Sequence, residues 1–235
     1  MIALLKEDHS APLVSIQIWV GTGSIHEQNY LGSGLSHAIE HMIFKGTTTK
    51  KPAEIAKIID DAGGTINAYT SLDRTVFYVD IPAKYWQTGL DVLADAIMNP
   101  AFPEEEWKKE KEVITREMAM NNDMPERQLS RLLLRAAYRI HPYRVPVIGH
   151  EELFKKLKKT DLETFFHSRY TPDNMIIAIA GDIDLTQCKA VLKKTFSGFE
   201  RRSRCPVVLP KESPQIAARS AHKTGAYEVT RLEWT

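Results

Sequence analysis

The stretch Gly34-Leu-Ser-His-Ala-Ile-Glu-His-Met-Ile-Phe-Lys-Gly46 is the most informative part of this chain. Its apolar residues recur at helical spacing, at Leu35, Ile39, Met42 and Ile43. His37 and His41 are four residues apart, so on a helix they share one face about a turn apart, with Glu40 beside them. Gly46 is placed to end the helix. The pattern predicts a helix that packs inward and carries two imidazoles and a carboxylate at the border of its apolar face.

These three side chains suggest metal chemistry. Two neutral imidazoles and a carboxylate form the core of a catalytic zinc site, which also needs a third protein ligand and an open position for water. The order H-x-x-E-H is the inverted form of the H-E-x-x-H zinc-peptidase motif. Short motifs also occur by chance, and a histidine on a helix is more often a surface or core residue than a ligand. The prediction therefore depends on a third ligand elsewhere in the chain.

The segment 103–118 supplies candidates for that ligand. It begins with a proline followed by three glutamates, which is typical of a helix start. Trp107, Glu110, Ile114 and Glu117 are spaced by three, four and three residues, so they share one stripe of the helix. Because Trp107 and Ile114 mark this stripe as inward-facing, we expect both glutamates to point to the interior, where an unpaired carboxylate is costly. A bound cation would compensate; the alternative is a solvated face of a charge-rich helix.

Taken together, these features resemble the pitrilysin-type zinc peptidases, which include insulin-degrading enzyme and the mitochondrial processing peptidase. Glu117 follows His41 by 76 residues (117 minus 41), which is the family's usual interval between the second histidine and the ligand glutamate. The resemblance covers roughly residues 12–200. Further matches, in family order, are Gly23-Ser-Ile-His-Glu27, Phe44-Lys-Gly-Thr47, Gly63-Gly-Thr-Ile-Asn-Ala-Tyr-Thr70, His141-Pro-Tyr143 with Pro146 and Gly149, and Tyr170-Thr-Pro-Asp-Asn-Met175 leading to Gly181-Asp182.

The resemblance implies a role for each residue of the motif. His37, His41 and Glu117 would be the ligands of one zinc ion. Glu40 would be the general base that takes a proton from the zinc-bound water and passes it to the leaving amine. Glu110 would complete the catalytic set as an acid that holds a ligand or water in orientation. Because imidazole and carboxylate ligands suit several divalent ions, manganese and cobalt stay open as alternatives to zinc.

The resemblance also implies residues that contact the substrate. Asn67 and Ala68 match the family segment that pairs with a peptide as an additional strand, a mode in which main-chain hydrogen bonds supply affinity. Phe44, next to the histidine motif, is assigned to substrate binding with them. For Asn67 the alternative is a structural role in a turn or at a strand end.

Composition excludes several other classes of protein. The chain has 235 residues, 43% of them hydrophobic, and a formal net charge of +1, which gives no electrostatic case for binding nucleic acid or a membrane surface. The basic clusters at 155–159 and 201–204 are local and suggest a solvated helix face or a linker. No apolar run approaches the ~20 residues of a transmembrane segment. Cys188 and Cys205 are too few for a disulfide framework.

The order of predicted elements indicates an α+β fold, with a mainly antiparallel sheet and helices packed on one face, as in one half of a clamshell-type metallopeptidase. Strands are predicted at 13–20, 65–71, 75–81 and 175–180, and helices at 34–46, 52–62, 84–98, 103–118, 125–140, 161–170 and 185–196. Residues 1–200 are expected to form an N-terminal metal-binding peptidase domain. Residues 201–235 are expected to be a linker and the start of a second domain, with a new strand at 227–234.

The resemblance implies a zinc-dependent endopeptidase that hydrolyses peptides or short unfolded polypeptides. Relatives enclose the substrate between two similar halves, so the partner would be a homologous C-terminal half, a second subunit or a second copy in a homodimer. The chain alone is expected to bind metal but to cleave peptides weakly. It is also expected to start late relative to the family, so a leader could have been removed, and cytoplasmic, periplasmic and organellar locations all stay open.

Two other functions compete with this one. The first is a non-catalytic scaffold or peptide-binding subunit of the same family, a class that typically has lost a ligand or the base. All four groups, the ligands His37, His41 and Glu117 and the base Glu40, are present here. The second is a metal lyase or isomerase, because S-ribosylhomocysteine lyase shares the H-x-x-E-H pattern. That enzyme uses a cysteine ligand, and neither Cys188 nor Cys205 lies in a comparable context.

Overall fold

Five strands form a single sheet in the order β1-β5-β2-β4-β3 in this computed structural model, which describes residues 1–200, 206–225 and 229–234. The strands are β1 (Ile2–Glu7), β2 (Leu13–Val20), β3 (Thr65–Thr70), β4 (Thr75–Pro82) and β5 (Met175–Gly181). β1 runs parallel to β5, and the other three pairings are antiparallel. The predicted α+β class with a mainly antiparallel sheet is confirmed. β1 was not predicted, because its short apolar run does not alternate with polar residues.

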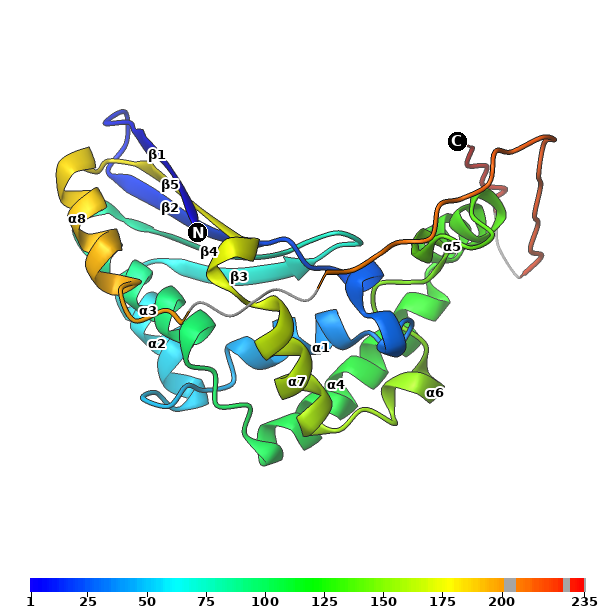
Figure 1. Cartoon of the computed structure of the whole chain (residues 1–235), viewed down its shortest axis with the longest axis horizontal. Helices are drawn as coiled ribbons and strands as arrows, with labels where there is room; N and C mark the ends of the chain where they lie inside the picture. Colours follow the sequence, from blue (N-terminus) through cyan, green and yellow to red (C-terminus); the bar gives the residue numbers. More distant parts are fainter. Residues whose placement is uncertain (201–205, 226–228, 235) are drawn as a thin grey trace.

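One face of the sheet is covered and the other is open (Figure 1). Val14, Ile16, Ile18 and Val20 on β2 are at most 1% exposed, as their alternation predicted, and pack into the core. The residues between them, Ser15, Gln17 and Trp19, are half-buried on the opposite face. Burial of a single face is the usual arrangement for an antiparallel sheet.

Eight helices are described. They are α1 (Leu35–Ile43), α2 (Pro52–Asp61), α3 (Trp86–Met98), α4 (Glu104–Asp123), α5 (Pro125–Ala137), α6 (Glu151–Phe154), α7 (Lys159–Arg169) and α8 (Leu185–Thr195). Short 3-10 turns, η1 (Ser24–His26), η2 (Gln28–Tyr30), η3 (Ala83–Tyr85), η4 (Pro142–Arg144) and η5 (Pro172–Asn174), connect several of them. α4 extends five residues past the predicted end at Met118, α5 ends three residues before Ile140, and the one-turn helix α6 was not predicted.

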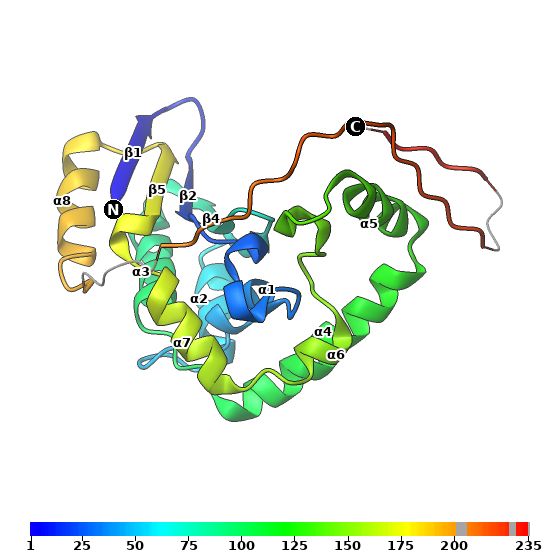
Figure 2. The same ribbon diagram turned by 45° about the vertical axis from the view of Figure 1, so that its right-hand side comes forward.

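The helix α1 occupies the centre of the molecule, with α4 passing beside it toward α5 (Figure 2). Leu35, Ile39, Met42 and Ile43 are fully buried, so the predicted inward face of α1 is confirmed. On α4, Trp107 and Ile114 are also buried and belong to the same core. Because both helices turn their apolar faces toward this core, their polar faces meet along one seam.

The start of α1 is held by a close backbone approach. Gly34 has a positive φ of 72°, and a Cβ atom at this position would lie 2.1 Å from the carbonyl oxygen of Ile148. The N–H of His150 donates to the carbonyl of Gly32 at 2.8 Å. The loop between α5 and α6 is therefore fastened to the residues that precede α1.

The segment after α8 was predicted as a linker followed by a new strand. Residues 206–225 contain no helix or strand, and Glu212 accepts the backbone N–H groups of Arg139, Ile140 and His141 at the end of α5. The basic residues 201–204, Cys205 and the first residues of the predicted strand lie outside the described residues. Residues 229–234 form no strand, so that part of the prediction is wrong, because no described strand pairs with them.

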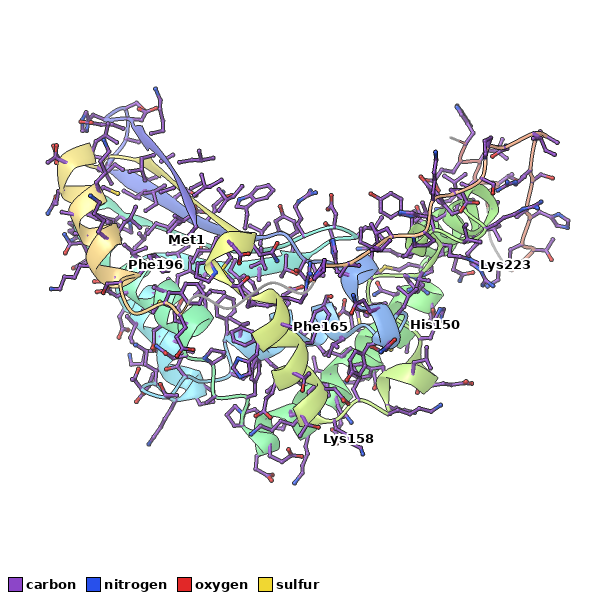
Figure 3. The ribbon with its side chains drawn as sticks, viewed as in Figure 1. Met1, His150, Lys158, Phe165, Phe196 and Lys223 are labelled. Carbon is purple, nitrogen blue, oxygen red and sulfur yellow. The ribbon has the colours of Figure 1, made fainter. Side chains whose placement is uncertain are left out.

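The surface agrees with the remaining composition arguments. Lys155, Lys156 and Lys158 are exposed, and Figure 3 shows Lys158 at the periphery of the molecule, as expected for a solvated basic cluster. Cys188 is fully buried as a small packing residue of α8. In the described part of the chain, none of the helices has the length and apolar character that crossing a bilayer requires.

Candidate metal centre

Three side chains from two helices converge at the seam between α1 and α4. The Nε2 atoms of His37 and His41 both face Oε2 of Glu117, at 3.6 and 3.7 Å respectively. One donor atom from each of the three side chains lies within 4.8 Å of the others, a condition that no further group of His, Cys, Asp or Glu side chains among the described residues meets. The fold therefore brings together the three residues that the sequence predicts as ligands.

The spacing of these donor atoms suits one tetrahedral ion. Ligand atoms that each lie ~2.0–2.2 Å from a tetrahedral ion are about 3.3–3.6 Å from one another. The distances from the imidazole nitrogens to Glu117, 3.6 and 3.7 Å, are close to that range and too long for ordinary hydrogen bonds. If all three side chains bound one ion, a fourth position would stay open, as in catalytic rather than structural zinc sites.

His37 is held in the neutral form that binds metals. Burial lowers the pKa of His37 to about 3, and the nearby charge of His41 acts in the same direction. The two rings meet edge to face with centroids 4.6 Å apart. Nδ1 of His37 is buried and has no hydrogen-bond partner among the described residues, so its Nε2 is the atom offered to the cluster. A neutral imidazole is the form required of a metal ligand.

His41 is oriented by Glu110. Nδ1 of His41 and Oε2 of Glu110 are 2.9 Å apart, and Nζ of Lys45 lies 2.7 Å from Oε1 of the same carboxylate. Although burial opposes ionisation, the hydrogen bonds from His41 and Lys45 hold the pKa of Glu110 below its ordinary value. A carboxylate on one ring nitrogen fixes the tautomer and directs the other nitrogen to the metal. The buried position predicted for Glu110 is confirmed, at 5% exposure.

Glu117 differs from its prediction in one respect. Its side chain is 39% exposed, whereas the stripe analysis placed it in the interior with Glu110. The reason is that Glu117 lines a cleft, whereas the next residue, Met118, is still buried in the core. The carboxylate is therefore accessible from solvent while it still faces both imidazoles.

Glu40 points to the same cleft and contacts the sheet. Oγ1 of Thr70, the last residue of β3, donates to Oε2 of Glu40 at 2.5 Å. Burial raises the pKa of Glu40, and the hydrogen bond from Thr70 partly opposes this shift. A carboxylate with a raised pKa is better suited to take up a proton near neutral pH than an ordinary glutamate.

The cleft at this site has a volume of about 450 Å³. Its walls come from α1, β3, α4, α5 and the loop that precedes α6. The lining residues are His37, Glu40, Ala68, Tyr69, Thr70, Leu72, Glu117, Asn121, Arg127, Arg131, Leu134, Val145, Pro146, Val147 and Ile148. An extended peptide would therefore meet strand β3 on one side and α5 on another.

The three residues predicted to bind substrate lie in different places. Ala68 lines the cleft, and its N–H donates to Oδ1 of Asn67 at 2.8 Å rather than to β4. Asn67 lies on the same edge strand but is not part of the lining. Phe44 packs edge to face against Phe77 at 5.8 Å between ring centroids and is also not part of the lining. Their roles toward a substrate stay predictions.

Several site residues were not assigned a role from the sequence. Lys45 lies two residues after the end of α1, so its nearness in the sequence to His41 was the only local signal for its contact with Glu110. Thr70 belongs to the segment Gly63–Thr70 that resembles the family, but no pattern in the sequence predicts its hydrogen bond to Glu40. Arg127 and Arg131 line the cleft from α5, and only the packing of that helix against the site reveals them.

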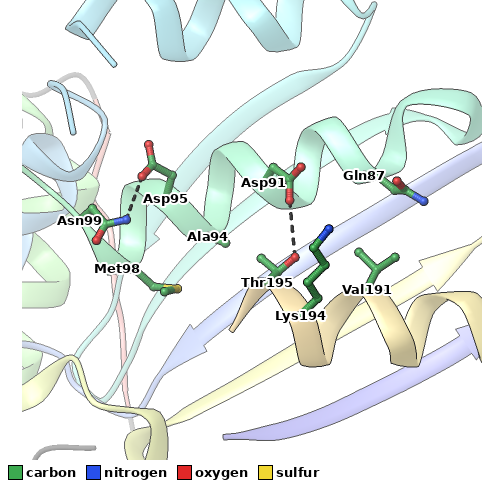
Figure 4. Close-up of a pocket in the computed structure, with 9 residues that line it drawn as sticks. All are labelled: Gln87, Asp91, Ala94, Asp95, Met98, Asn99, Val191, Lys194 and Thr195. Atoms are coloured by element: carbon green, nitrogen blue, oxygen red, sulfur yellow. Dashed lines mark hydrogen bonds between the residues drawn. The ribbon is translucent and has the colours of Figure 1, made fainter. Parts of the chain in front are cut away.

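A second hollow between α3 and α8 carries acids but has a structural explanation (Figure 4). Asp95 accepts hydrogen bonds from Thr47, Thr49 and Lys50, at 2.7 to 2.8 Å. Oδ1 of Asp91 lies 3.5 Å from the Thr195 hydroxyl. The carboxylates in this hollow thus join α3 to its neighbours and do not form a second cluster of ligands.

Comparison with known proteins agrees with this geometry. Residues 2–151 match the family described as Insulinase (Peptidase family M16), and residues 156–233 match the family described as Peptidase M16 inactive domain. The two matches meet near α6, yet β5 of the second lies between β1 and β2 of the first, so one sheet spans both.

The relatives are proteases or peptidases by name. An uncharacterized zinc protease of Bacillus subtilis is 38% identical over 201 residues, which cover 86% of this chain and 49% of the relative. A probable mitochondrial-processing peptidase subunit beta of Arabidopsis thaliana is 31% identical over 188 residues, covering 80% and 35%. The crystal structure of a protease from Helicobacter pylori superposes with a TM-score of 0.82 at 26% identity, covering 92% and 52%. The chain therefore spans about half or less of the length of these relatives.

Proposed function

The chain belongs to peptidase family M16, the insulinase family, and on that premise we propose that it is the metal-binding part of a zinc-dependent endopeptidase acting on peptides or short unfolded polypeptides. The observation that carries the proposal is the convergence of His37, His41 and Glu117 on one point, at the spacing of ligands around a single ion. The name of the Bacillus subtilis relative, a zinc protease, supports zinc as that ion.

His37, His41 and Glu117 would hold the zinc, with Glu110 fixing the orientation of His41. A bound zinc ion would supply Lewis acidity toward the peptide carbonyl and lower the pKa of a coordinated water. Glu110 is itself neutralised by Lys45, so its charge is balanced before any metal binds. This arrangement favours a preformed site, because Glu110 orients His41 and the three proposed ligand side chains already face one another.

Glu40 would act as the general base. Thr70 holds one oxygen of its carboxylate, which leaves the other to take a proton from water and to pass it to the nitrogen of the leaving amine. Its raised pKa supports this role, because a carboxylate that is a stronger base takes a proton from water more readily. General acid–base groups contribute typically ~10²–10⁴-fold to a rate.

The peptide would bind along the free edge of β3. Ser71 donates its N–H to Arg74 at the hairpin end, so the backbone groups of Thr65, Asn67 and Tyr69 pair with β4 while those of Ala68 face away from it. An edge strand with outward-facing N–H and C=O groups can accept an additional strand. Asn67 now occupies the Ala68 N–H, and we propose that it releases this group to the substrate.

Residues 1–200 would be the peptidase domain, with residues 201–235 as a linker and the start of a second domain. Since the chain spans about half of the Bacillus subtilis relative, we propose that a homologous second half, or a separate subunit, completes the chamber around the substrate. A homodimer is the third arrangement that would enclose it.

The proposal is tested by measuring metal and hydrolysis together. Zinc content of the purified chain is determined by elemental analysis for wild type, Glu117→Ala and Glu40→Gln, and cleavage of a mixture of unfolded peptides is followed by mass spectrometry. We expect about one zinc per wild-type chain, loss of zinc in Glu117→Ala, and retained zinc without cleavage in Glu40→Gln. Cleavage that persists in Glu40→Gln would refute the assigned base. Peptide binding without cleavage in wild type, with and without a second half, would instead indicate the non-catalytic scaffold.

A further inference from the structure

The wall of the cleft formed by α5 is cationic. Arg127, Arg131 and Leu134 follow one another at four and three residues, so they share one face of the helix, and all three line the cleft together with His37 and Glu40. Arg127 is exposed and Arg131 is half-buried. Two guanidinium groups thus face the space in which the proposed reaction takes place.

Neither arginine has an acidic partner in the described part of the chain. Arg131 donates to the neutral Oδ1 of Asn122 at 2.6 Å, and no carboxylate lies within ion-pair distance of Arg127 or Arg131. Burial lowers the pKa of Arg131, and repulsion from Arg127 acts in the same direction. Two adjacent, unneutralised cations in a partly enclosed cleft would be stabilised by an anion from outside the chain.

The acids of the cleft are already engaged elsewhere. Thr70 donates to Glu40, and Glu117 faces the two histidines. By contrast, Arg231 at the other side of α5 is paired with Glu126 at 2.8 Å. Among the described residues no acid forms an ion pair with Arg127 or Arg131, and both line the same cleft as the β3 strand proposed to bind the peptide backbone.

We propose that Arg127 and Arg131 form a subsite that binds a carboxylate of the peptide substrate, so that the enzyme selects acidic peptides. This inference rests on the proposed function, because it assumes that peptides enter this cleft. A guanidinium group binds a carboxylate through two parallel hydrogen bonds, which makes arginine selective for this planar anion. Leu134 and Val147 add apolar surface against which the methylene groups of a glutamate would pack.

The carboxylate has two sources, an Asp or Glu side chain and the C-terminus of the peptide. A set of labelled peptides of one sequence separates them: an internal Glu with an amidated C-terminus, an internal Gln with a free C-terminus, and internal Gln or Lys with an amidated C-terminus. Binding is measured by fluorescence anisotropy with the Glu40→Gln chain loaded with zinc, so that a proposed substrate stays intact during the measurement.

We expect at least one carboxylate peptide to bind about 10- to 100-fold more tightly than the amidated Gln peptide. Arg127→Gln and Arg131→Gln should each reduce this ratio, and the double variant Arg127→Glu with Arg131→Glu should favour the Lys peptide instead. Arg135→Gln is the matched control, because Arg135 is an exposed arginine of the same helix that does not line the cleft. Arg127 is exposed, so its replacement tests the subsite even where the Arg131 variant fails to fold.

Two outcomes separate this inference from the proposed function. Equal binding of the acidic, neutral and basic peptides, or an equal loss of preference in Arg135→Gln, would overturn the subsite, while cleavage of the same peptides by the wild-type chain would leave the peptidase intact. Selective binding of carboxylate peptides that the wild-type chain never cleaves, with or without a second half, would uphold the subsite and overturn the peptidase.

Discussion

Among single residues, the contacts of Glu110 explain how the centre is organised before a metal arrives. Its carboxylate lies between Nδ1 of His41 and Nζ of Lys45, at 2.9 and 2.7 Å. Because His41 lies on α1 and Lys45 follows the end of this helix, one buried acid of α4 fixes the ring of a proposed ligand and the position of α4 relative to α1. The Glu110 side chain therefore contributes both to the proposed metal affinity and to the packing of α4 against α1.

Replacing Glu110 should weaken the metal site without abolishing it. Glu110→Gln keeps the shape of the side chain but removes the charge that orients His41, and losses of this kind cost ~10–100-fold in metal affinity. The measurement is competition for zinc with a chelator of known affinity. Glu105→Gln, on the exposed first turn of α4, is the matched control and should leave affinity unchanged. Equal affinities in the two variants would contradict the role of Glu110.

A second residue gives the chain a pH-dependent stability. Burial raises the pKa of Glu27 to about 8, even though its carboxylate accepts the N–H of Ser36 at 2.9 Å. The other oxygen of Glu27 has no hydrogen-bond partner among the described residues. Between pH 4.5 and 8 the folded chain therefore keeps a proton that the unfolded chain has lost, and the free energy of unfolding falls as pH rises through this window.

We expect the Glu27→Gln variant to show a weaker decrease of stability between pH 5 and pH 8 than wild type. The contribution of Glu27 to this slope is at most about 1.4 kcal/mol per pH unit. Denaturant unfolding at a series of pH values measures it, with Glu112→Gln on the exposed face of α4 as the control. Parallel curves for wild type and Glu27→Gln would show that Glu27 is ionised in both states.

At the scale of elements, the position of α1 depends on Gly34, the residue that precedes it. Gly34 and Gly63 have almost the same backbone conformation, with φ of 72° and 73°, but only Gly34 is in close contact with another segment. Comparing Gly34 with Gly63 therefore separates two reasons for glycine, the left-handed backbone conformation and the lack of room for a side chain.

Substitution by alanine should therefore affect the two glycines differently. Gly63→Ala should cost about 1–2 kcal/mol for the left-handed conformation alone, because its nearest neighbour would be 3.8 Å away. Gly34→Ala should cost more and should also lower zinc affinity, because the new methyl group would lie 2.1 Å from the Ile148 oxygen and displace α1. Denaturant midpoints and zinc titration test both effects. Similar losses for the two variants would exclude the steric argument.

The edge strand β3 provides the second test at this scale. Ala68→Pro removes only an N–H that points away from β4, so the sheet should tolerate it. Loss of one main-chain hydrogen bond to the peptide, worth about 1–1.5 kcal/mol, should raise KM about 5- to 10-fold. Ala68→Val keeps the N–H group and is the control for side-chain effects. An unchanged KM in Ala68→Pro, with normal thermal stability, would argue against strand addition at this edge.

For the whole molecule, the open cleft and the uncovered face of the sheet are the features that matter. Figure 1 shows no helix over this face, and α5 projects beyond the end of the sheet. Water therefore has access to the proposed reaction site from the side opposite the helices. A chamber that excludes water strengthens every electrostatic interaction inside it, so closure by a second half is expected to matter for catalysis more than for metal binding.

Adding a homologous second half should raise peptide hydrolysis by about 10²–10³-fold, the effect of one lost oxyanion donor in other enzymes, while zinc content stays constant. The assay compares the purified chain with and without the second half, produced as a separate protein. Addition of the same half to Glu40→Gln is the control, which should stay inactive. Equal hydrolysis with and without the second half would show that the chain already contains a complete site.

The periodicity of hydrophobic residues within single segments was sufficient to predict most of the helices and strands and their buried faces. The alternation on β2, the apolar face of α1 and the stripe formed by Trp107, Glu110 and Ile114 all predicted the observed burial, because each depends on the period of one element. The class of the fold followed from the order of these elements. The three proposed ligands were also identified from the sequence, the third through its resemblance to the family.

The tertiary structure decided the contacts between segments that no local period connects. β1 became a strand because β5, more than 170 residues away in the chain, provides a parallel partner. The same holds for the hydrogen bond from Thr70 to Glu40 and for the arginines of α5 that line the cleft. Glu117 is accessible although its stripe begins in the core, because it lines a cleft that several segments form together. The sequence determines the face on which a side chain lies, whereas packing determines what that face meets.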